Sequence, residues 1–142
     1  MKSAILALCL LASPAAAGEV DCLAQAIYHE ARGEPVETQI AVGNTILNRV
    51  EAMGFPDTVC GVVHQPGQFS WWSGRNPPVT EPAAYKTARS LARKILAGDI
   101  ERGRRDVFWF YEPGHQSRAI IESSWRYRTI GGLEFRREKR WN

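Results

Sequence analysis

Apolar residues near the start of the chain recur at intervals of three and four, which is the spacing of one face of an α-helix. Leu23, Ala26 and Ile27 belong to such a series, and we predict a helix over residues 22–32. Asp21 precedes this range as a candidate N-cap, and the glycine that follows it stands where helices often end in a left-handed residue.

Glu30 continues this apolar series and so breaks its pattern. Burial of a lone carboxylate is costly, and the last turn of a helix has a negative potential. Both effects disfavour the charged form and raise the pKa of Glu30, as a general acid working near neutral pH requires. The alternative is a structural glutamate that pairs with Arg32, Arg49 or Arg75.

A second helical series follows, because Pro35 fits the first turn of a helix and apolar residues recur until Gly54. The face that we expect to be buried consists of Val36, Ile40, Gly43, Leu47 and Val50. A glycine in mid-helix costs about 1 kcal/mol relative to alanine, so Gly43 indicates a close approach, which we expect from the first helix. Asn44 and Asn48 either bond to a loop or face solvent.

Residues 55–82 are rich in proline and glycine and are predicted to be mostly loop, with one helical turn near 58–64. A third helix is predicted over 81–97, with Thr80 as its N-cap and Gly98 as its stop. Its inward positions are Ala84, Ala88, Leu91 and Ile95.

Strand patterns are found late in the chain. Residues 107–111 form a β-type aromatic run, and a strand pair is predicted over 125–130 and 133–135, turned by the two glycines between them. The basic tail, 136–142, is expected to be poorly ordered. Helices first and a small sheet late predict a helix-dominated α+β domain with a small antiparallel sheet.

The N-terminus has the features of an export signal. Lys2 supplies a positive charge, 3–11 is an apolar run too short to span a bilayer, and 14–17 holds the small residues of a cleavage site. We therefore expect residues 1–17 to be a signal peptide that is removed on export. The remaining 18–142 is expected to be a single domain without stable membrane insertion, periplasmic or secreted.

The formal net charge of +3 is unevenly distributed. Residues 18–84 contain three basic and eight acidic side chains, whereas 85–142 contain fourteen basic and seven acidic ones. The basic half favours an exported partner of negative charge, and a solvated face without a partner is the alternative. No nucleic-acid-binding motif is found, so we expect no nucleic acid as partner, and we expect a monomer.

Two cysteines, Cys22 and Cys60, remain after the predicted cleavage. In an oxidising compartment we expect them to form one disulfide that ties the first helix to the loop after the second. Two free buried thiols are the alternative.

The loop contains a cluster of aromatic and polar side chains. These are Gln68, Phe69, Ser70, Trp71 and Trp72. Sugar sites use aromatic rings that stack on pyranose C–H surfaces, and polar groups that bind hydroxyls. A small loop core that holds Phe69 and one tryptophan is the alternative.

Other chemistries are disfavoured by spacing. Gly33 occupies the position where a zincin helix would carry its second histidine after His29 and Glu30. The three histidines are scattered without metal-ligand spacing, and no serine lies in a nucleophile elbow. We expect no metal and no cofactor.

Four blocks of the sequence together resemble the SleB-type cell wall hydrolases, also called spore cortex-lytic enzymes. The blocks are CLAQAIYHEARGE at 22–34, QIAVGNTILNRV at 39–50, VCGVV at 59–63 and QFSW at 68–71. The resemblance is dense over 22–71 and looser through 108–111 and 130–131.

The resemblance implies a lysozyme-like, lytic-transglycosylase-like fold that cleaves peptidoglycan glycan strands at the β-1,4 bond between N-acetylmuramic acid and N-acetylglucosamine. It assigns the catalytic acid to Glu30, which the helical pattern also indicates. The substrate contacts that we expect are Gln68, Phe69, Ser70, Trp71 and Tyr111. The sequence departs from the family pattern at His29, commonly glycine, and at Leu133 and Arg136, where relatives tend to carry histidine and tyrosine.

The mechanism depends on the number of carboxylates in the site. A hydrolase usually needs two, about 5–9.5 Å apart, whereas a lytic transglycosylase needs one acid. Glu34 is expected to cap the second helix, and Glu112 and Asp106 flank a strand that can reach the cleft. We favour the single-acid mechanism. The alternatives are a hydrolytic N-acetylmuramidase and a catalytically silent peptidoglycan-binding module.

Overall fold

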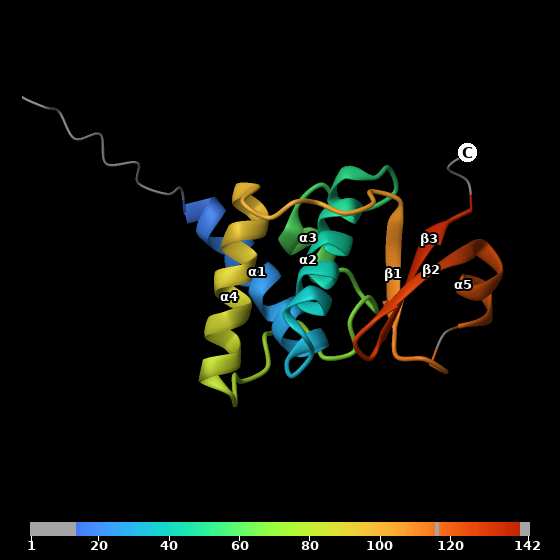
Figure 1. Ribbon diagram of the computed structural model, residues 1–142. Helices are drawn as coiled ribbons and strands as arrows, with labels where there is room; N and C mark the ends of the chain where they lie inside the picture. The colour runs from blue at the N-terminus through green and yellow to red at the C-terminus, as the bar shows by residue number, and fades with distance from the viewer. Residues whose placement is uncertain (1–13, 116, 140–142) are drawn as a thin grey trace, which may run out of the picture.

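The structure, a computed structural model, describes residues 14–115 and 117–139. Its elements are α1 (Pro14–Ala31), α2 (Val36–Glu51), α3 (Val59–Val63), α4 (Pro82–Ala97), β1 (Val107–Tyr111), α5 (Arg118–Ser123), β2 (Ser124–Ile130) and β3 (Leu133–Glu138). Helices α1 to α4 form one side of the molecule, and the sheet with α5 forms the other (Figure 1). The predicted helix-dominated α+β class is confirmed. Within the described residues, no helix is long and apolar enough to cross a membrane.

Helix α1 is the centre of the helical part, and α2, α3 and α4 all pack against it. Its predicted inward residues, Leu23, Ala26 and Ile27, are completely buried. Burial of these side chains is the main source of stability for such a helix, because isolated helices of this length are marginal in water.

The predicted start of this helix was wrong. The helix begins at Pro14, so Asp21 lies inside it instead of capping it, and accepts a hydrogen bond of 2.9 Å from Nε of Arg89 in α4. Alanine is the strongest helix former, and the alanines after Pro14 let the helix extend toward the N-terminus. The predicted cleavage after Ala17 therefore falls within α1 and stays a prediction, and the rest of the predicted signal, 1–13, lies outside the described residues.

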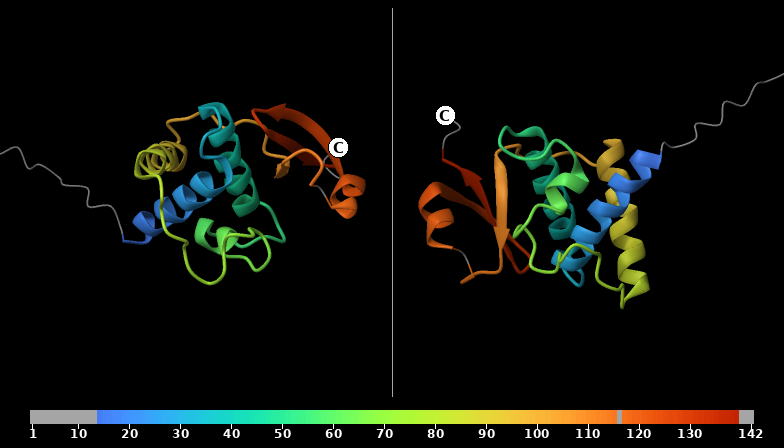
Figure 2. Two further views of the ribbon diagram at one scale, coloured as in Figure 1. Left: turned by 90° about the horizontal axis from the view of Figure 1, so that it is seen from below. Right: turned by 180° about the vertical axis from the view of Figure 1, so that it is seen from behind.

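The predicted buried face of α2 was also wrong. Val36 is 52% exposed, and three further members of the predicted stripe are only partly buried. The side chains that are buried instead include Val42, Ile46 and Arg49. Helix α2 lies between the other helices and strand β1 (Figure 2), so it is covered on two sides and a single apolar stripe does not define its interior.

Two details of α2 agree with the sequence analysis. A Cβ on Gly43 would lie 3.3 Å from Cδ1 of Ile27 in α1 and 2.6 Å from Cδ1 of Ile95 in α4. The close approach expected at this glycine is therefore confirmed. Asn48 bonds to a loop, because its Nδ2 donates to the carbonyl oxygens of Arg104 and Val107 at 2.8 and 2.9 Å.

The helical turn predicted near 58–64 is α3, and a disulfide between Cys22 and Cys60 joins it to α1, as expected. The N-terminus of α3 is further held by Glu19 of α1, whose carboxylate accepts a hydrogen bond of 2.6 Å from the backbone N–H of Val59.

Helix α4 begins at Pro82 with Glu81, not Thr80, at its N-cap. Thr80 instead contacts the buried hydroxyl of Tyr28, which accepts hydrogen bonds from the backbone N–H groups of Thr80 and Glu81 at 3.1 and 3.0 Å. Of the predicted inward residues of α4, Ala88, Leu91 and Ile95 are buried, and Ala84 is half-buried.

The three strands form one antiparallel sheet in the order β1-β3-β2. The predicted strand and the predicted hairpin are both present, with β3 extending to Glu138. The expectation of poor order is therefore wrong for 136–138, because Arg136 is buried and its guanidinium bonds to Ser124 and Glu134. Residues 140–142 lie outside the described part. The short helix α5 was not predicted.

Candidate active site

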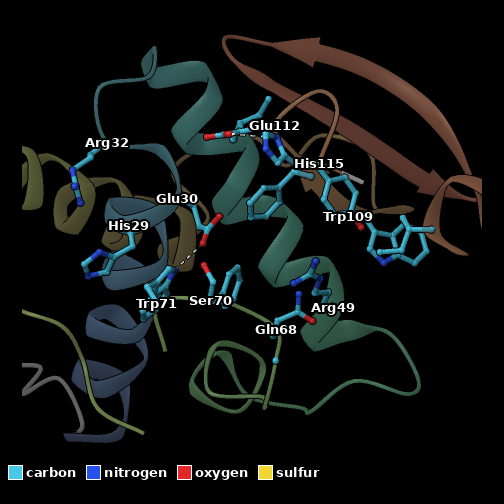
Figure 3. A pocket seen from close by; sticks show the side chains of 16 residues that line it. His29, Glu30, Arg32, Arg49, Gln68, Ser70, Trp71, Trp109, Glu112 and His115 are labelled. Atoms are coloured by element: carbon cyan, nitrogen blue, oxygen red, sulfur yellow. Dashed lines mark hydrogen bonds and ion pairs between the residues drawn. The ribbon is translucent and has the colours of Figure 1, made fainter. Parts of the chain in front are cut away.

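The C-terminal end of α1, the loop after α3 and the end of β1 enclose a cavity of about 920 Å³ (Figure 3). Its lining includes every residue that the sequence analysis proposed as catalytic or substrate-binding: Glu30, Gln68, Phe69, Ser70, Trp71 and Tyr111. A second hollow of about 560 Å³ shares Glu30, His29 and Arg32 with the first. Glu30 therefore lies where two hollows meet.

Glu30 is in the last turn of α1, as predicted, and is half-buried. The indole Nε1 of Trp71 donates a hydrogen bond of 2.7 Å to its Oε1 (Figure 3). No arginine of the described residues lies within ion-pair distance of Glu30. Arg32 instead forms an ion pair of 2.9 Å with Glu81. A structural ion pair therefore does not account for the position of Glu30.

Burial is the largest influence on Glu30 and raises the pKa of its carboxyl group. The hydrogen bond from Trp71 and the positive charge of Arg49 oppose this shift, while the negative charge of Glu112 adds to it. Desolvation prevails, so the pKa of Glu30 is higher than that of an exposed glutamate. The carboxyl group is thus tuned toward holding a proton.

The tryptophans of the loop have separate environments. Trp71 lines the cavity, and its ring lies 4.7 Å from that of His29 and 5.6 Å from that of Phe69. Trp72 stacks on His64 at 3.8 Å and does not line the cavity. Phe69 is only 5% exposed. The loop core expected as an alternative thus holds Phe69 and Trp72, but Phe69 also lines the cavity, together with Trp71.

Three acidic residues were considered as a second carboxylate, and one of them lines the main cavity. Glu112 borders both hollows, is 75% exposed and lies 3.7 Å from Nδ1 of His115. Asp106 lies outside both hollows and pairs with Arg104 at 2.6 Å.

Glu34 does not cap α2 as predicted, because no side chain caps that helix. Its carboxylate accepts a hydrogen bond of 2.8 Å from the backbone N–H of Gly132 in the β2–β3 turn. A Cβ on either glycine of this turn would collide with that carboxylate. Glu34 therefore fastens the hairpin to the start of α2, where it borders only the second hollow.

The positions that depart from the family pattern have different environments. His29 and Leu133 line both hollows, and burial, with a smaller effect of Arg32, lowers the pKa of His29. Arg136 lies in the sheet and does not line either hollow. Only the first two departures therefore change the lining of the site.

Several lining residues were not proposed as site residues from the sequence. They include Arg49, Trp109, Phe110, His115 and Ile120, while Glu112 had been considered only as a second carboxylate and Leu133 only as a departure from the family pattern. Arg49 could have been found from the sequence, because it is next to predicted inward positions of the second helix. The sequence analysis had named it only as a possible ion-pair partner for Glu30. Among the described residues, no three His, Cys, Asp or Glu side chains are grouped as metal ligands.

The model of the cell wall hydrolase family (Hydrolase_2) matches residues 33–136, which begin just after Glu30. The chain belongs to this family. Among curated relatives, the spore cortex-lytic enzyme of Oceanobacillus iheyensis is 50% identical over 52 residues, 37% of this chain and 19% of the relative. That of Bacillus subtilis is 48% identical over 82 residues, 58% of this chain and 25% of the relative. The cell wall hydrolase CwlJ of O. iheyensis is 32% identical and covers 67% of this chain and 69% of the relative.

The family fold is also seen in solved structures. The catalytic domain of Bacillus cereus SleB superposes with a TM-score of 0.68 and 26% identity, covering 85% of this chain and 91% of that domain. The catalytic domain of SleB from Bacillus anthracis, described as a germination-specific lytic transglycosylase, superposes with a TM-score of 0.67 and 26% identity. This match covers 88% of this chain and 96% of that domain. The SleB-like fold expected from the resemblance is therefore confirmed. The chain spans less than a third of the curated spore cortex-lytic enzymes that it matches.

Proposed function

We propose that this cell wall hydrolase family member cleaves peptidoglycan glycan strands at the β-1,4 bond between N-acetylmuramic acid and N-acetylglucosamine, with Glu30 as the general acid. The observation that carries the proposal is the half-buried carboxyl group of Glu30 at the junction of two hollows, held by the indole of Trp71. A polysaccharide strand can pass from one hollow to the other and place one glycosidic bond beside Glu30.

The hydrogen bond from Trp71 supports an assignment of the oxygen on which the acid carries its proton. Because Nε1 of Trp71 is a donor only, Oε1 of Glu30 must act as an acceptor. The proton of the neutral carboxyl group is then on Oε2, which has no hydrogen-bond partner among the described residues. This oxygen is the one that can protonate the leaving glycosidic oxygen.

In the mechanism that we favour, Glu30 acts alone. It transfers its proton to the glycosidic oxygen as the bond from that oxygen to the anomeric carbon of N-acetylmuramic acid breaks. The C6 hydroxyl of the same sugar then attacks the anomeric carbon and returns its proton to the Glu30 carboxylate. The product ends in 1,6-anhydromuramic acid, and the acid is regenerated without water.

A hydrolytic N-acetylmuramidase is the second candidate, and Glu112 is the observation that favours it. Glu112 borders the same cavity, and its charge raises the pKa of Glu30. In an inverting hydrolase such a second carboxylate activates water on the opposite face of the sugar. Its high exposure and its contact with His115 make it less suited to this role than a buried, positioned base.

The products of digestion distinguish these candidates. Purified peptidoglycan is incubated with the protein, and the soluble muropeptides are analysed by mass spectrometry. We expect anhydro-muropeptides, which are lighter by one water than reducing-end products. Reducing ends that incorporate ¹⁸O from labelled water would instead indicate hydrolysis. Absence of released fragments from several peptidoglycan types would point to a binding module.

The predicted export signal agrees with this substrate, because peptidoglycan lies outside the cytoplasmic membrane. Periplasmic or secreted localisation therefore forms part of the proposal. Peptidoglycan strands are the expected partner, and no cofactor enters the proposed mechanism.

A further inference from the structure

Arg49 is a buried cation in the floor of the main cavity. It is 3% exposed and its guanidinium carbon lies within about 6 Å of the ring centres of Phe55, Phe69 and Phe110. Its Nε donates a hydrogen bond of 2.8 Å to the carbonyl oxygen of Phe108. This bond fixes the side chain of α2 against strand β1, so that the guanidinium has one defined position.

The rest of that guanidinium is not fully satisfied. Nη1 of Arg49 is buried and has no hydrogen-bond partner among the described residues, and no carboxylate there lies within ion-pair distance of it. A buried charge without a partner is strongly unfavourable. Burial lowers the pKa of Arg49 to about 10, so the side chain stays charged near neutral pH and its cost is not relieved by loss of a proton.

The hydroxyl of Tyr111, at the end of β1, is likewise buried without a hydrogen-bond partner among the described residues. It lines the same cavity. Burial raises the pKa of Tyr111 to about 12, so it remains a donor. The positive charge of Arg49 opposes this rise, so the two groups lie near each other. The cavity thus holds two donors that no described protein group accepts, next to Glu30.

These donors call for an acceptor that a ligand brings. The phenyl rings of Phe69 and Phe110 line the cavity beside them, so the complementary group has one oxygen acceptor and an adjacent apolar carbon. An amide carbonyl with its methyl neighbour has this composition. Peptidoglycan offers such a group in two forms: the acetamido group, which both sugars carry, and the lactyl amide that begins the peptide.

We propose that Nη1 of Arg49 and the hydroxyl of Tyr111 bind one amide carbonyl oxygen of the glycan strand, and so position the sugar beside Glu30. The inference rests on the proposed function and adds to it a specificity-determining pair. It assigns to Arg49 a direct contact with substrate, and to the Phe69–Phe110 wall the contact with the methyl group.

Binding without turnover tests the pair. In a Glu30→Gln background, dissociation constants are measured by NMR titration for chitotetraose and for cellotetraose, which carries hydroxyl groups in place of the acetamido groups. Tyr111→Phe removes one neutral hydrogen bond and should weaken chitotetraose binding roughly two- to tenfold. Cellotetraose binding should not change. Tyr127→Phe, the same change at an exposed tyrosine outside the cavity, is the matched control.

Arg49→Lys keeps the charge but loses the fork of donors, and should weaken chitotetraose binding about tenfold or more. Thermal melts accompany both variants. Tyr111→Phe should melt at the same temperature as its parent or higher, because the hydroxyl that it removes is buried without a partner. The test therefore stands on Tyr111→Phe even if Arg49→Lys does not fold.

A third ligand, a disaccharide fragment that carries its peptide, separates the two sources of the carbonyl. Weakening by Tyr111→Phe with chitotetraose assigns the acetamido group, and weakening only with the peptide-bearing fragment assigns the lactyl amide. Unchanged binding of all ligands, or equal weakening with cellotetraose, overturns the inference. If the Glu30→Gln parent binds no glycan at all, the proposed function itself fails.

Discussion

The hydrogen bond from Trp71 to Glu30 joins the two motifs that the sequence holds 41 positions apart. In the proposed mechanism, it makes Trp71 a positioning residue for the acid as well as a candidate ring for sugar stacking. The indole favours the ionised carboxylate, whereas burial favours the neutral form and has the larger effect. The balance at this residue therefore depends on how well water is excluded from the end of α1.

Substitution of Glu30 by glutamine should abolish proton donation and retain the bond to Trp71, because the amide oxygen still accepts. We expect turnover of peptidoglycan to fall by about 10²- to 10⁴-fold. In the parent, activity should decline as pH rises through the raised pKa of Glu30, because the acid form is then lost. Glu37→Gln, at an exposed residue of α2 outside both cleft hollows, is the control. Near-full turnover by Glu30→Gln would show that another carboxyl group is the acid.

The same substitution has a pH-dependent effect on stability. A carboxyl group with a raised pKa in the folded state loses stability as pH rises from its ordinary value through the raised one. The free energy of unfolding of Glu30→Gln, measured by denaturant titration, should therefore rise relative to that of the parent across this window. Above the window, the difference between the two should stay constant. A difference that is independent of pH would contradict the raised pKa.

At the scale of elements, the site is held by connections between α1 and the segments that follow it. The disulfide joins α1 to α3, and Glu34 joins the start of α2 to the β2–β3 turn. The Nε of Arg49 joins α2 to β1. These links bring the end of α1, the aromatic loop and the end of β1 around one cavity.

Removal of the disulfide should weaken this arrangement. For a sequence separation of 38 residues, the chain-entropy model assigns the bridge about 3–4 kcal/mol. The Cys22→Ser, Cys60→Ser double variant should therefore lose stability of this order in denaturant titrations. A reductant should destabilise the parent and leave the double variant unchanged. Two free thiols in unreduced, denatured parent protein would contradict the bridge.

At the scale of the whole molecule, charge is divided between the two parts of the fold. The acidic half includes α1 and α2, and the basic half includes the sheet. Arg126 and Arg128 of β2 are exposed on that sheet. Long-range attraction to anionic cell wall is the expected consequence, and it is distinct from the short-range contacts within the cavity.

Salt should therefore weaken association with intact peptidoglycan more than association with neutral chitotetraose. The Debye length falls from about 10 Å at 0.1 M salt to about 3 Å at 1 M. Pull-down with insoluble peptidoglycan across this range, with NMR titration of chitotetraose beside it, measures the contrast. Charge-reversal of Arg126 to glutamate should reduce the salt dependence. Equal salt sensitivity for both ligands would show that the basic half does not attract peptidoglycan and serves only the solubility of the protein.

The sequence by itself determined the helix that carries Glu30, the strand that carries Tyr111 and the pairing of Cys22 with Cys60. Each of these depends on local pattern or on composition: the spacing of Leu23, Ala26 and Ile27, an aromatic β-type run, and exactly two cysteines after the predicted cleavage. The motif blocks around Glu30 and Trp71 also indicated the family and the fold.

Only the tertiary structure decided what surrounds these residues. The stripe predicted for α2 failed because that helix is covered on two sides, which no single-helix period encodes. Asp106 and Glu112 flank the same strand, yet only Glu112 borders the cavity. In the sequence, Arg49 looks like an ordinary arginine on a helix. Only packing in the folded protein excludes water from it and leaves Nη1 without a partner among the described residues. The burial of a side chain and its hydrogen-bond partners depend on segments that are far apart in the chain. These two properties made Arg49 a candidate binding residue.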